Sequence, residues 1–433
     1  MKNKNMNRRT FLKSTIGSGL GLLAAPYLVP STVFGQTAPS EKITLGFVGM
    51  GKQGTYLLRA FLNEPNTQVL AVCDVDELKL NRAQRMTNEF YANQSGAGAY
   101  DGCDKYELFE DVVNRDDIDG VVIATPDHWH ALVVVQSARA GKDIYCEKPL
   151  SQTIEESQIM TRVTREYNRV FQVGSMQRSY SQFRQACELV RNGYIGDVEH
   201  VTVDVGGPPR PSWELGAETE PDYLNWDLWA GPTMWRPYNS ELSPHISKDI
   251  FPHWRWYRAY GGGMMTDWGA HHFDIAQWGL GMDDSGPVEI HPPAEEGYDV
   301  LTYKYANGVT MTRNSFEEGH GVLFEGTEGK IVVNRSYIKT FPESLQSVQL
   351  KPGDVHLYES KNHYADWLNS VRQRKKPICD VSVGKHSVIV CHLGNIAYRL
   401  NRSLYWDPNT ERFQNDSDAN EMLSRPYRSP WRL

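Results

Sequence analysis

The feature that most constrains the fold of this chain is a glycine-rich turn between an apolar run and a helical stretch. The segment reads GFVGMGKQG, in which Gly49, Gly51 and Gly54 have the spacing GxGxxG. Glycines so spaced allow a tight turn, let a pyrophosphate approach the backbone and let a helix pack closely on a strand. The N–H groups at the start of that helix then face the anion. We therefore predict a dinucleotide-binding turn.

A carboxylate after the next apolar run supports this interpretation. Asp74 ends the run QVLAVCD and follows Gly54 by 20 residues, a separation typical of dinucleotide-binding βαβ units. An acidic side chain there accepts a hydrogen bond from a ribose 2′-hydroxyl and repels a 2′-phosphate. The pattern therefore favours NAD over NADP, and a plain glycine turn beside an exposed aspartate is the alternative.

The surrounding sequence alternates between short apolar runs and amphipathic segments. The runs are ITLGFVGM, QVLAVCD, GVVIATP and KDIYCEKP, and this rhythm is typical of βαβ units and a parallel sheet. Beyond residue 150 a few helices are followed by strand-like alternation, near VEHVTVDV and again at 288–334. We predict an α/β protein with an N-terminal Rossmann dinucleotide-binding domain at 43–150. The remainder, 151–433, is predicted to be a C-terminal α+β domain with a largely antiparallel open sheet and a helical tail.

The first 35 residues have the pattern of an export signal. The segment NRRTFLK carries paired arginines, and a weakly apolar stretch at 16–29 follows it. This resembles a twin-arginine signal cleaved near Gly35, with residues 36–42 as a linker or arm. An ordinary basic N-terminus or an uncleaved anchor is the alternative. We expect a periplasmic or otherwise exported protein that is soluble after signal removal.

Charge and cysteine usage exclude several classes of function. The formal charge of −8 contains no basic block, so nucleic acid is not an expected partner. Six cysteines show neither paired nor metal-type spacing. The HxH at 128 and 130 and the HH at 271 and 272 are weak zinc signatures without a third ligand. We therefore predict no metal.

Polar side chains follow two further predicted strands. The segment ATPDHWH follows one of them and CEKP follows the other, and ligands of open parallel sheets bind at such strand ends. Solvated turns are the alternative for either segment alone. We expect the cofactor to be contacted by Gly49, Gly51, Gly54, Asp74, Thr125, Pro126, His128, His130, Glu147 and Lys148.

A second glycine-led segment, GGGMMTDWGAHHFD, concentrates acid and base groups. Asp267 and His271 are four residues apart, so they share one face if the segment is helical. His272 then points elsewhere, whereas Asp274 returns to the face of His271.

Taken in order, GFVGMGKQG, AVCDVD, ATPDHWH, EKP and GGGMMTDWGAHHFD resemble the Gfo/Idh/MocA oxidoreductases. The resemblance covers nearly the whole chain after the export-like segment, including FEGTEGKIVV and HYADWLNSVRQRKKP. It implies that Lys148 is the family's EKP lysine and that Asp267 and His271 are its catalytic pair. It also implies a homo-oligomer, a dimer or tetramer, formed through the open sheet face around residues 300–313.

These residues suit the oxidation of a secondary alcohol. A neutral imidazole at His271 can take the hydroxyl proton as hydride leaves carbon for NAD. Lys148 can steady the reacting oxygen, and Asp267 can orient the ring or a neighbouring sugar hydroxyl.

The substrate class is inferred from an aromatic-rich stretch. Eight of the 12 tryptophans lie between residues 213 and 278, and aromatic faces suit the apolar faces of pyranose rings. Packing in a core is the alternative. The predicted substrate contacts are Trp254, Arg255, Trp256, Tyr257, Trp268 and His272.

The favoured function is an exported oxidoreductase that oxidises a ring hydroxyl, C3 in the first instance, of a sugar or glycoside. Its NAD should be a tightly bound prosthetic group, and the 36–42 arm is expected to close over it in the manner of relatives that have one. Two alternatives remain open. One is an NAD-dependent glycosidase that oxidises C3 transiently and eliminates the aglycone, with Tyr180, His253 or Tyr257 as its second acid/base. The other is a non-catalytic sugar-binding protein that keeps the nucleotide as a structural element.

Overall fold

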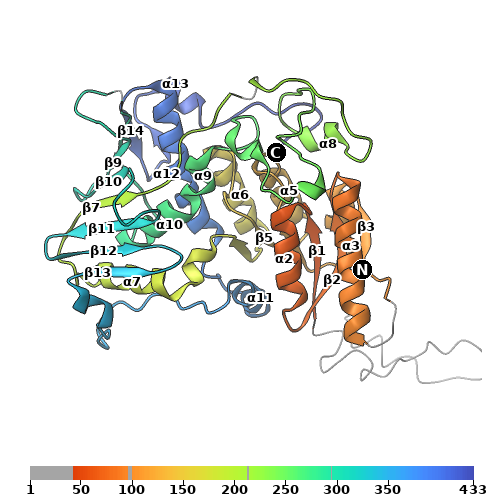
Figure 1. Cartoon of the computed structure of the whole chain (residues 1–433), viewed down its shortest axis with the longest axis horizontal. Helices are drawn as coiled ribbons and strands as arrows, with labels where there is room; N and C mark the ends of the chain where they lie inside the picture. The colour runs from red at the N-terminus through yellow and green to blue at the C-terminus, as the bar shows by residue number, and fades with distance from the viewer. Residues whose placement is uncertain (1–41, 96–99, 212–213, 294) are drawn as a thin grey trace, which may run out of the picture. The chain divides into compact units, whose positions relative to one another are not determined.

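The computed structural model describes residues 42–95, 100–211, 214–293 and 295–433. The predicted export signal and all but the last residue of the predicted arm lie outside the described residues. The described chain forms one compact unit with two sheets (Figure 1). No helix of the described part is long and apolar enough to cross a membrane.

The first sheet is six-stranded and parallel, in the order β3-β2-β1-β4-β5-β6. This order is typical of a Rossmann fold. The strands are β1 (Ile43–Val48), β2 (Thr67–Cys73), β3 (Asp104–Tyr106), β4 (Gly120–Ile123), β5 (Asp143–Cys146) and β6 (Phe171–Val173). The sheet extends past residue 150, where we placed the domain boundary, because β6 pairs with β5.

Helices cover both faces of the parallel sheet, so β4 and β5 are buried along their whole length. They are α2 (Lys52–Leu62), α3 (Glu77–Ser95), α4 (Phe109–Val113), α5 (Asp127–Arg139) and α6 (Ile154–Glu166). A late helix, α11 (His363–Gln373), also packs here. Its Trp367 is fully buried and contacts Phe61 and Tyr145 edge-on, with ring centroids 5.5 and 5.8 Å apart. The predicted helical tail therefore returns to the first domain.

The second sheet is nine-stranded, in the order β13-β12-β11-β7-β10-β9-β8-β14-β15. Its neighbours are antiparallel except β7 and β10, which are parallel. The predicted, largely antiparallel second sheet is thus confirmed. The strands are β7 (Val198–Val203), β8 (Glu289–His291), β9 (Thr302–Lys304), β10 (Thr310–Arg313), β11 (Val322–Gly326), β12 (Gly329–Val333), β13 (Ile338–Phe341), β14 (Leu404–Asp407) and β15 (Arg412–Phe413).

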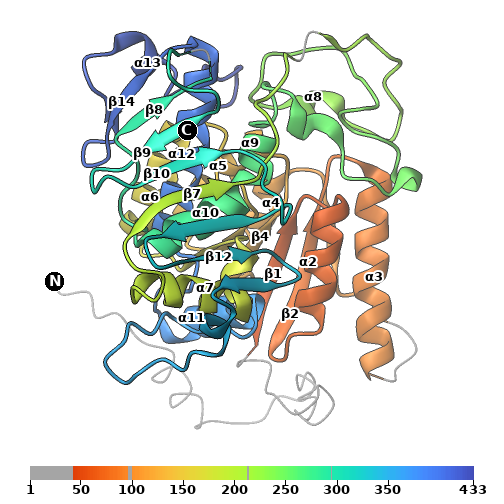
Figure 2. The same cartoon turned by 60° about the vertical axis from the view of Figure 1, so that its left-hand side comes forward.

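Two long helices lie behind this sheet, as Figure 2 shows. They are α10 (Gly269–Leu280) and α12 (Val381–Leu400), both buried along most of their length. Phe273 of α10 packs against Tyr303 of β9, with ring centroids 5.6 Å apart. The other helices are α7 (Ser181–Arg191), α8 (Trp226–Ala230), α9 (Met264–Asp267) and α13 (Ser417–Glu421), with 3-10 turns η3 (Met176–Ser179), η5 (Ile246–Lys248), η6 (His253–Trp256) and η7 (Glu343–Ser347).

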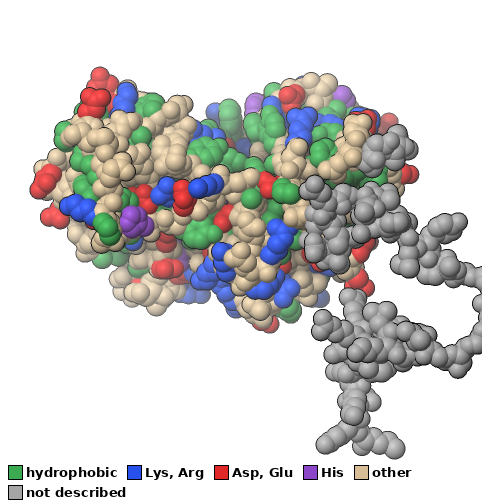
Figure 3. Space-filling view, turned by 90° about the horizontal axis from the view of Figure 1, so that it is seen from below, with side chains coloured by type: hydrophobic (Ala, Val, Ile, Leu, Met, Phe, Trp, Pro, Cys, Tyr) green, Lys and Arg blue, Asp and Glu red, His purple; other side chains and the backbone are tan. Residues whose placement is uncertain are grey.

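The surface carries both signs of charge. Figure 3 shows Lys and Arg side chains grouped toward one edge of the lower face, with acidic side chains scattered among hydrophobic and neutral ones. The six cysteines are all free and buried, where a thiol packs as a small hydrophobe.

Candidate active site

A long pocket lies at the carboxyl ends of the parallel strands and is lined by the glycine turn. Gly49 has a φ of +90°, and a Cβ there would come within 2.6 Å of the backbone of Ala124 and Thr125. A Cβ at Gly54 would lie 2.0 Å from the carbonyl oxygen of Gly49. Gly51, before the first residue of α2, has nothing within 4 Å of its would-be Cβ. Two glycines therefore make the turn, and the third leaves room for a pyrophosphate.

The acidic residue after β2 lines the same pocket. The Asp74 carboxylate accepts hydrogen bonds from the N–H groups of Met50, at 2.6 Å, and Asp76, at 2.9 Å. Burial raises the pKa of Asp74. The nearby cations have other partners, since Lys79 pairs with Asp76 at 2.8 Å and Arg82 donates to Met50 O at 2.8 Å. Asp74 thus lines the pocket at the end of β2, and its contact with a ribose stays a prediction.

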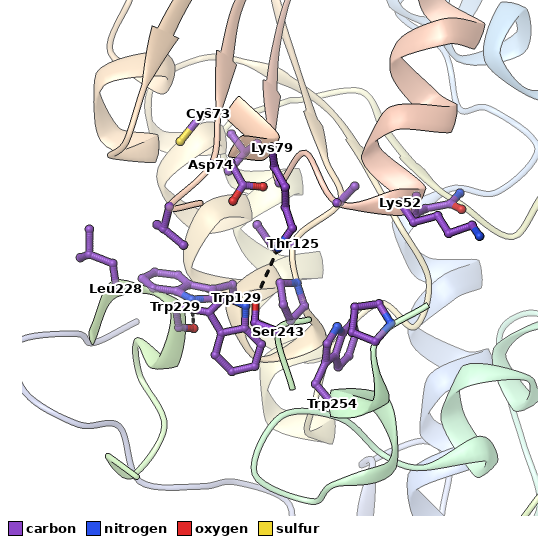
Figure 4. A pocket seen from close by; sticks show the side chains of 18 of the residues that line it. Lys52, Cys73, Asp74, Lys79, Thr125, Trp129, Leu228, Trp229, Ser243 and Trp254 are labelled. Atoms are coloured by element: carbon purple, nitrogen blue, oxygen red, sulfur yellow. Dashed lines mark hydrogen bonds between the residues drawn. The ribbon is translucent and has the colours of Figure 1, made fainter. Parts of the chain in front are cut away.

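The opposite wall of the pocket comes from the second half of the chain. Residues 242–255, here called the strap, supply much of it, together with Trp229 and Trp431. Figure 4 shows Asp74 and Lys79 on one side and Trp229 and Trp254 on the other. Lys79 donates to Ser243 Oγ of the strap at 3.4 Å, and Lys52 lies 3.6 Å from the Asp249 carboxylate.

A cluster of charged groups follows β5 and ends α9. The Lys148 ammonium lies 2.8 Å from Asp267 Oδ1 and 3.0 Å from the Asp267 carbonyl oxygen. Arg255 Nε, at the end of the strap, lies 3.3 Å from the same Oδ1. Burial raises the pKa of Asp267, but these two cations outweigh burial and hold that pKa below its ordinary value. The carboxylate therefore stays ionised between Lys148 and Arg255.

His271 lies one turn further on, in α10. Its side chain is buried, and its Nδ1 has no hydrogen-bond partner among the described residues. Burial, with the charge of Lys148 added, lowers the pKa of His271 well below its ordinary value. The ring is thus neutral, and its Nδ1 is left without a partner among the described residues. We predicted that Asp267 could orient this ring, but its carboxylate pairs with Lys148 and Arg255 instead.

The predicted helix across this segment is split. α9 ends at Asp267 and α10 begins at Gly269. Asp274, which we placed on the face of His271, is fully buried against Arg178, with 2.9 Å between Arg178 Nη2 and Asp274 Oδ1. It anchors α10 rather than assisting the histidine.

The histidines of ATPDHWH do not line the pocket, contrary to our prediction. His128 Nε2 lies 2.9 Å from Trp229 O. The His130 ring lies between Pro149 O, at 2.9 Å, and Thr125 O, at 3.0 Å. Because α5 starts at Asp127, its first turn carries both rings into the interior. His130 therefore joins the two strand-end loops to each other.

The other predicted cofactor contacts divide in two groups. Thr125 and Pro126 line the pocket, whereas Glu147 and Lys148 do not. Glu147 is buried and acts through Gln53, whose Nε2 lies 2.9 Å from Glu147 Oε1 and which itself lines the pocket. Burial raises the pKa of the Glu147 carboxyl.

The predicted substrate residues are only partly brought together. Arg255 and Trp268 lie at the charged cluster, since the Trp268 ring is 5.7 Å from that of His271. Trp254 lines the dinucleotide pocket beneath Arg255. His272 Nδ1 lies 2.9 Å from the backbone oxygen of Asp204 and is buried.

The remaining aromatic predictions belong to a small core. Tyr257 is buried and donates to Glu241 Oε2 at 2.9 Å, and Trp256 stacks on His253 at 4.8 Å. Tryptophan density here reflects packing of the segment that carries the strap, in a cluster of Leu224, Trp226, Trp229, Tyr238, Leu242, Trp254, Tyr257 and Tyr260.

Sequence reasoning missed Arg335 and Gln177. Arg335 lies over the Trp268 ring at 4.7 Å and donates to Gln177 Oε1 at 3.0 Å. Gln177 in turn donates to the His271 backbone oxygen at 3.2 Å. No motif marks Arg335, because it comes from the turn between β12 and β13, remote in sequence. Within the described ranges, no group of three or more His, Cys, Asp or Glu side chains is placed to hold a metal ion.

Comparison with known proteins identifies the family. Residues 43–175 match the model of the oxidoreductase family's NAD-binding Rossmann fold, and residues 210–433 match that of its C-terminal alpha/beta domain. The chain belongs to the Gfo/Idh/MocA oxidoreductase family. Its cofactor is NAD, and Gly49, Gly51 and Asp74 line the pocket at the ends of the parallel strands.

Curated relatives of this family match over less than half of their length. Glycosyl hydrolase family 109 protein 1 of Shewanella sp. (strain MR-4) is 28% identical over 212 residues, 45% of either chain. A family 109 protein of Shewanella baltica (strain OS185) is 26% identical over 211 residues, again 45% of each.

Solved structures of low identity share the fold. Aldose-aldose oxidoreductase from Caulobacter crescentus, complexed with glycerol, is 19% identical with a TM-score of 0.56, over 84% of this chain and 99% of that one. The WlbA dehydrogenase from Bordetella pertussis, in complex with NADH and UDP-GlcNAcA, is 18% identical with a TM-score of 0.58, over 85% and 98%.

Proposed function

We propose that this protein oxidises a ring hydroxyl of a sugar or glycoside, at C3 in the first instance, with NAD held as a prosthetic group. The observation that carries the proposal is the pairing of Lys148 with Asp267 beside a buried, neutral His271. Arg255 joins this cluster to the strap over the dinucleotide pocket. The sugar names of the relatives supply the substrate class.

Each residue of the cluster has a distinct role in the mechanism. NAD, when bound, accepts the hydride from the substrate carbon. The His271 imidazole takes the hydroxyl proton, for which a neutral ring is required. The Lys148 ammonium donates a hydrogen bond to the reacting oxygen. Asp267 keeps that ammonium in place through its carboxylate and its backbone oxygen.

The strap supports retention of the cofactor. It covers the pocket from the side opposite Asp74 and is tied to the first domain through Lys52 and Lys79. A cofactor that does not exchange must be reoxidised in the pocket after it has accepted the hydride. The hydride therefore returns to a second carbonyl substrate or to the same sugar. We assign a closing role to the strap; the same role for the 36–42 arm stays a prediction, because all but the last residue of the arm lies outside the described residues.

An NAD-dependent glycosidase is the second candidate. It is favoured by the relatives named as glycosyl hydrolases and by the place of Tyr180. Tyr180 follows the turn η3, whose Gln177 accepts a hydrogen bond from Arg335 at 3.0 Å. Arg335 packs on Trp268 at the cluster. His253 and Tyr257, the other candidate acid/bases, lie against Glu241 instead.

One experiment separates the candidates. The protein is prepared without added cofactor and dialysed extensively. One sample is denatured to measure the NAD that it releases. A second, native sample is incubated with nitrophenyl glycosides, with or without an artificial acceptor. Keto-sugar formed only with acceptor supports the oxidoreductase, whereas nitrophenol released without acceptor supports the glycosidase. Tight sugar binding with neither product, unchanged in Lys148→Ala, indicates a sugar-binding protein. If nothing binds or reacts across the panel, the proposal is wrong.

We also propose export by the twin-arginine route, on the strength of Arg8 and Arg9. Expression in a bacterial host followed by fractionation should place the wild-type protein in the periplasm. The Arg8→Lys/Arg9→Lys variant should stay in the cytoplasm, and equal distribution of the two would contradict the proposal.

Finally, we propose a homo-oligomer formed through the face of the second sheet turned away from α10 and α12. The open, largely antiparallel sheet supports this proposal, because such a sheet can leave one face free for a partner. Light scattering at micromolar concentration should give the mass of a dimer or tetramer. A monomer mass would remove the claim.

A further inference from the structure

A second cavity, of about 270 Å³, lies apart from the dinucleotide pocket. It is formed where the start of α6, the residues before α9 and the end of α12 meet, and it shares no lining residue with that pocket. Small-molecule sites begin at about this size. Neither the fold nor the proposed redox reaction accounts for it.

The cavity is lined by three arginines and by no carboxylate. Arg425 pairs with Glu156 at 2.8 Å. The other two, Arg258 and Arg399, are exposed, and neither guanidinium makes an ion pair or hydrogen bond with any described residue. Burial and the charge of Arg399 lower the pKa of Arg258. Two like charges held together favour an anion between them.

Two buried hydrogen-bond acceptors in the cavity wall also lack partners. They are Gln152 Oε1 and Asn395 Oδ1, and the Gln152 side chain is only 9% exposed. The Gln152 amide nitrogen donates to Arg258 O at 2.7 Å, and that of Asn395 donates to Gly262 O at 2.8 Å. A backbone oxygen can only accept, so the amide nitrogens must face it and the side-chain oxygens are the atoms left over.

The missing partners define the ligand. An unpaired buried acceptor is destabilising, and a donor such as a hydroxyl that reaches it would offset this cost. Ile154 and Ile396 add apolar wall of the kind that contacts the C–H face of a sugar ring. We propose that this cavity binds a small hydroxylated anion, a sugar carboxylate or sugar phosphate, outside the redox site.

The cavity wall is continuous with the redox site. Asn395 and Gln152 hold the backbone oxygens of Gly262 and Arg258. The N–H of the next glycine, Gly263, donates to Arg255 O at 2.9 Å, and α9 with Asp267 follows directly. A ligand in the cavity therefore contacts the segment that positions Arg255 and Asp267.

The test is isothermal titration of the full-length, NAD-loaded protein with glucuronate, glucose 6-phosphate, inorganic phosphate and glucose. At least one of the two sugar anions should bind about tenfold or more tightly than phosphate, because phosphate lacks the sugar hydroxyls. Glucose should give no saturable heat that Arg399→Met abolishes, since an uncharged sugar can bind only at the redox site. Which of the two sugar anions binds more tightly distinguishes carboxylate from phosphate recognition.

Variants place the binding in the cavity. Arg399→Met and Arg258→Met should each weaken the binding by about tenfold or more, whereas Arg412→Met, which removes an exposed arginine of β15, and Lys148→Met at the redox site should not. Unchanged fluorescence of bound NADH verifies folding of the variants. Binding lost in Lys148→Met but kept in Arg399→Met, phosphate binding as tight as the sugar anions, or no binding of any anion would each overturn the proposal.

Discussion

At the scale of single residues, the Asp267 carboxylate decides the geometry of the site. It accepts from Lys148 at 2.8 Å and lies 3.3 Å from Arg255. Without its charge the two cations would repel each other across a part-buried space. The carboxylate therefore positions the ammonium that would contact the reacting oxygen, although no hydrogen bond joins it to the His271 ring.

Asp267→Asn should retain the shape of the site and lose its charge. We expect kcat to fall by about 100-fold, the lower end of the contribution of a positioned proton donor, with little change in the NAD content. Steady-state kinetics on the glycoside found in the panel, with total NAD measured after denaturation, would show this. Asp222→Asn, at an exposed position, is the matched control, and a kcat equal to that of the control would contradict the role.

The buried His271 sets the pH dependence. Burial lowers its pKa well below 6.5, and the base works only when neutral, so activity is lost as pH falls through that lowered pKa. The acid limb of kcat/KM should therefore lie well below the ordinary histidine range. A pH profile of kcat/KM from 4 to 8 measures it. In His271→Gln the residual activity should lack that limb, and a limb centred near 6.5 in the wild type would refute the assignment.

At the scale of elements, the strap couples the cofactor pocket to the cluster. Its Trp254 lines the pocket, and its Arg255 lies over the Trp254 ring at 4.2 Å while contacting Asp267. The strap can open only if these contacts and those to Lys52 and Lys79 are released. It is therefore the element on which retention of NAD should depend.

Trp254→Ala should speed cofactor loss by opening the pocket wall. We expect the dissociation rate of NADH to rise by about tenfold or more, since changes in affinity are expressed mainly in dissociation rates. Displacement of bound NADH by excess NAD, followed by fluorescence, gives the rate. Trp235→Ala removes a tryptophan that is 53% exposed and outside the pocket lining. If both variants release NADH at the wild-type rate, the strap does not retain the cofactor.

The elements that could be predicted from sequence are those with a local period. The glycine turn, its strand and Asp74 follow from spacing over about 30 residues. The last parallel strand, Phe171–Val173, is too short for a periodic signal and is set by pairing with β5. The role of Arg335 depends on a turn that tertiary structure brings onto Trp268. The tryptophans near residue 256 misled because aromatic density does not distinguish a packed cluster from a ligand surface.

At the scale of the whole molecule, buried neutral histidines make stability depend on pH. His363 joins α11 to the first sheet, with its Nε2 3.0 Å from Val173 O. Burial lowers its pKa to about 4, and that of His128 and His272 to about 3. Above pH 6.5 these histidines are neutral in both the folded and the unfolded chain. Below pH 6.5 they bind protons in the unfolded chain but stay neutral in the folded chain, so the free energy of unfolding falls between about pH 6.5 and 4.

His363→Gln should flatten this dependence. Between pH 7 and pH 4, the free energy of unfolding should fall by about 3 kcal/mol less in the variant than in the wild type. The reason is that the variant lacks His363, whose pKa is lowered to about 4 in the folded protein. Urea unfolding at both pH values measures it. His245→Gln, at an exposed histidine, should follow the wild type. Parallel curves for all three proteins would contradict the prediction.

The dinucleotide pocket is lined both by Gly49 and by Trp431, whose ring packs edge-on against Trp129 at 5.8 Å. These residues leave the ribosome far apart in time. The glycine turn of a nascent chain emerges from the ribosome early. The pocket wall around NAD is complete only after the strap and then Trp431 have also emerged. Loading with the dinucleotide therefore follows the synthesis of Trp431, and a chain interrupted before Trp431 would hold its cofactor in a pocket that still lacks one side.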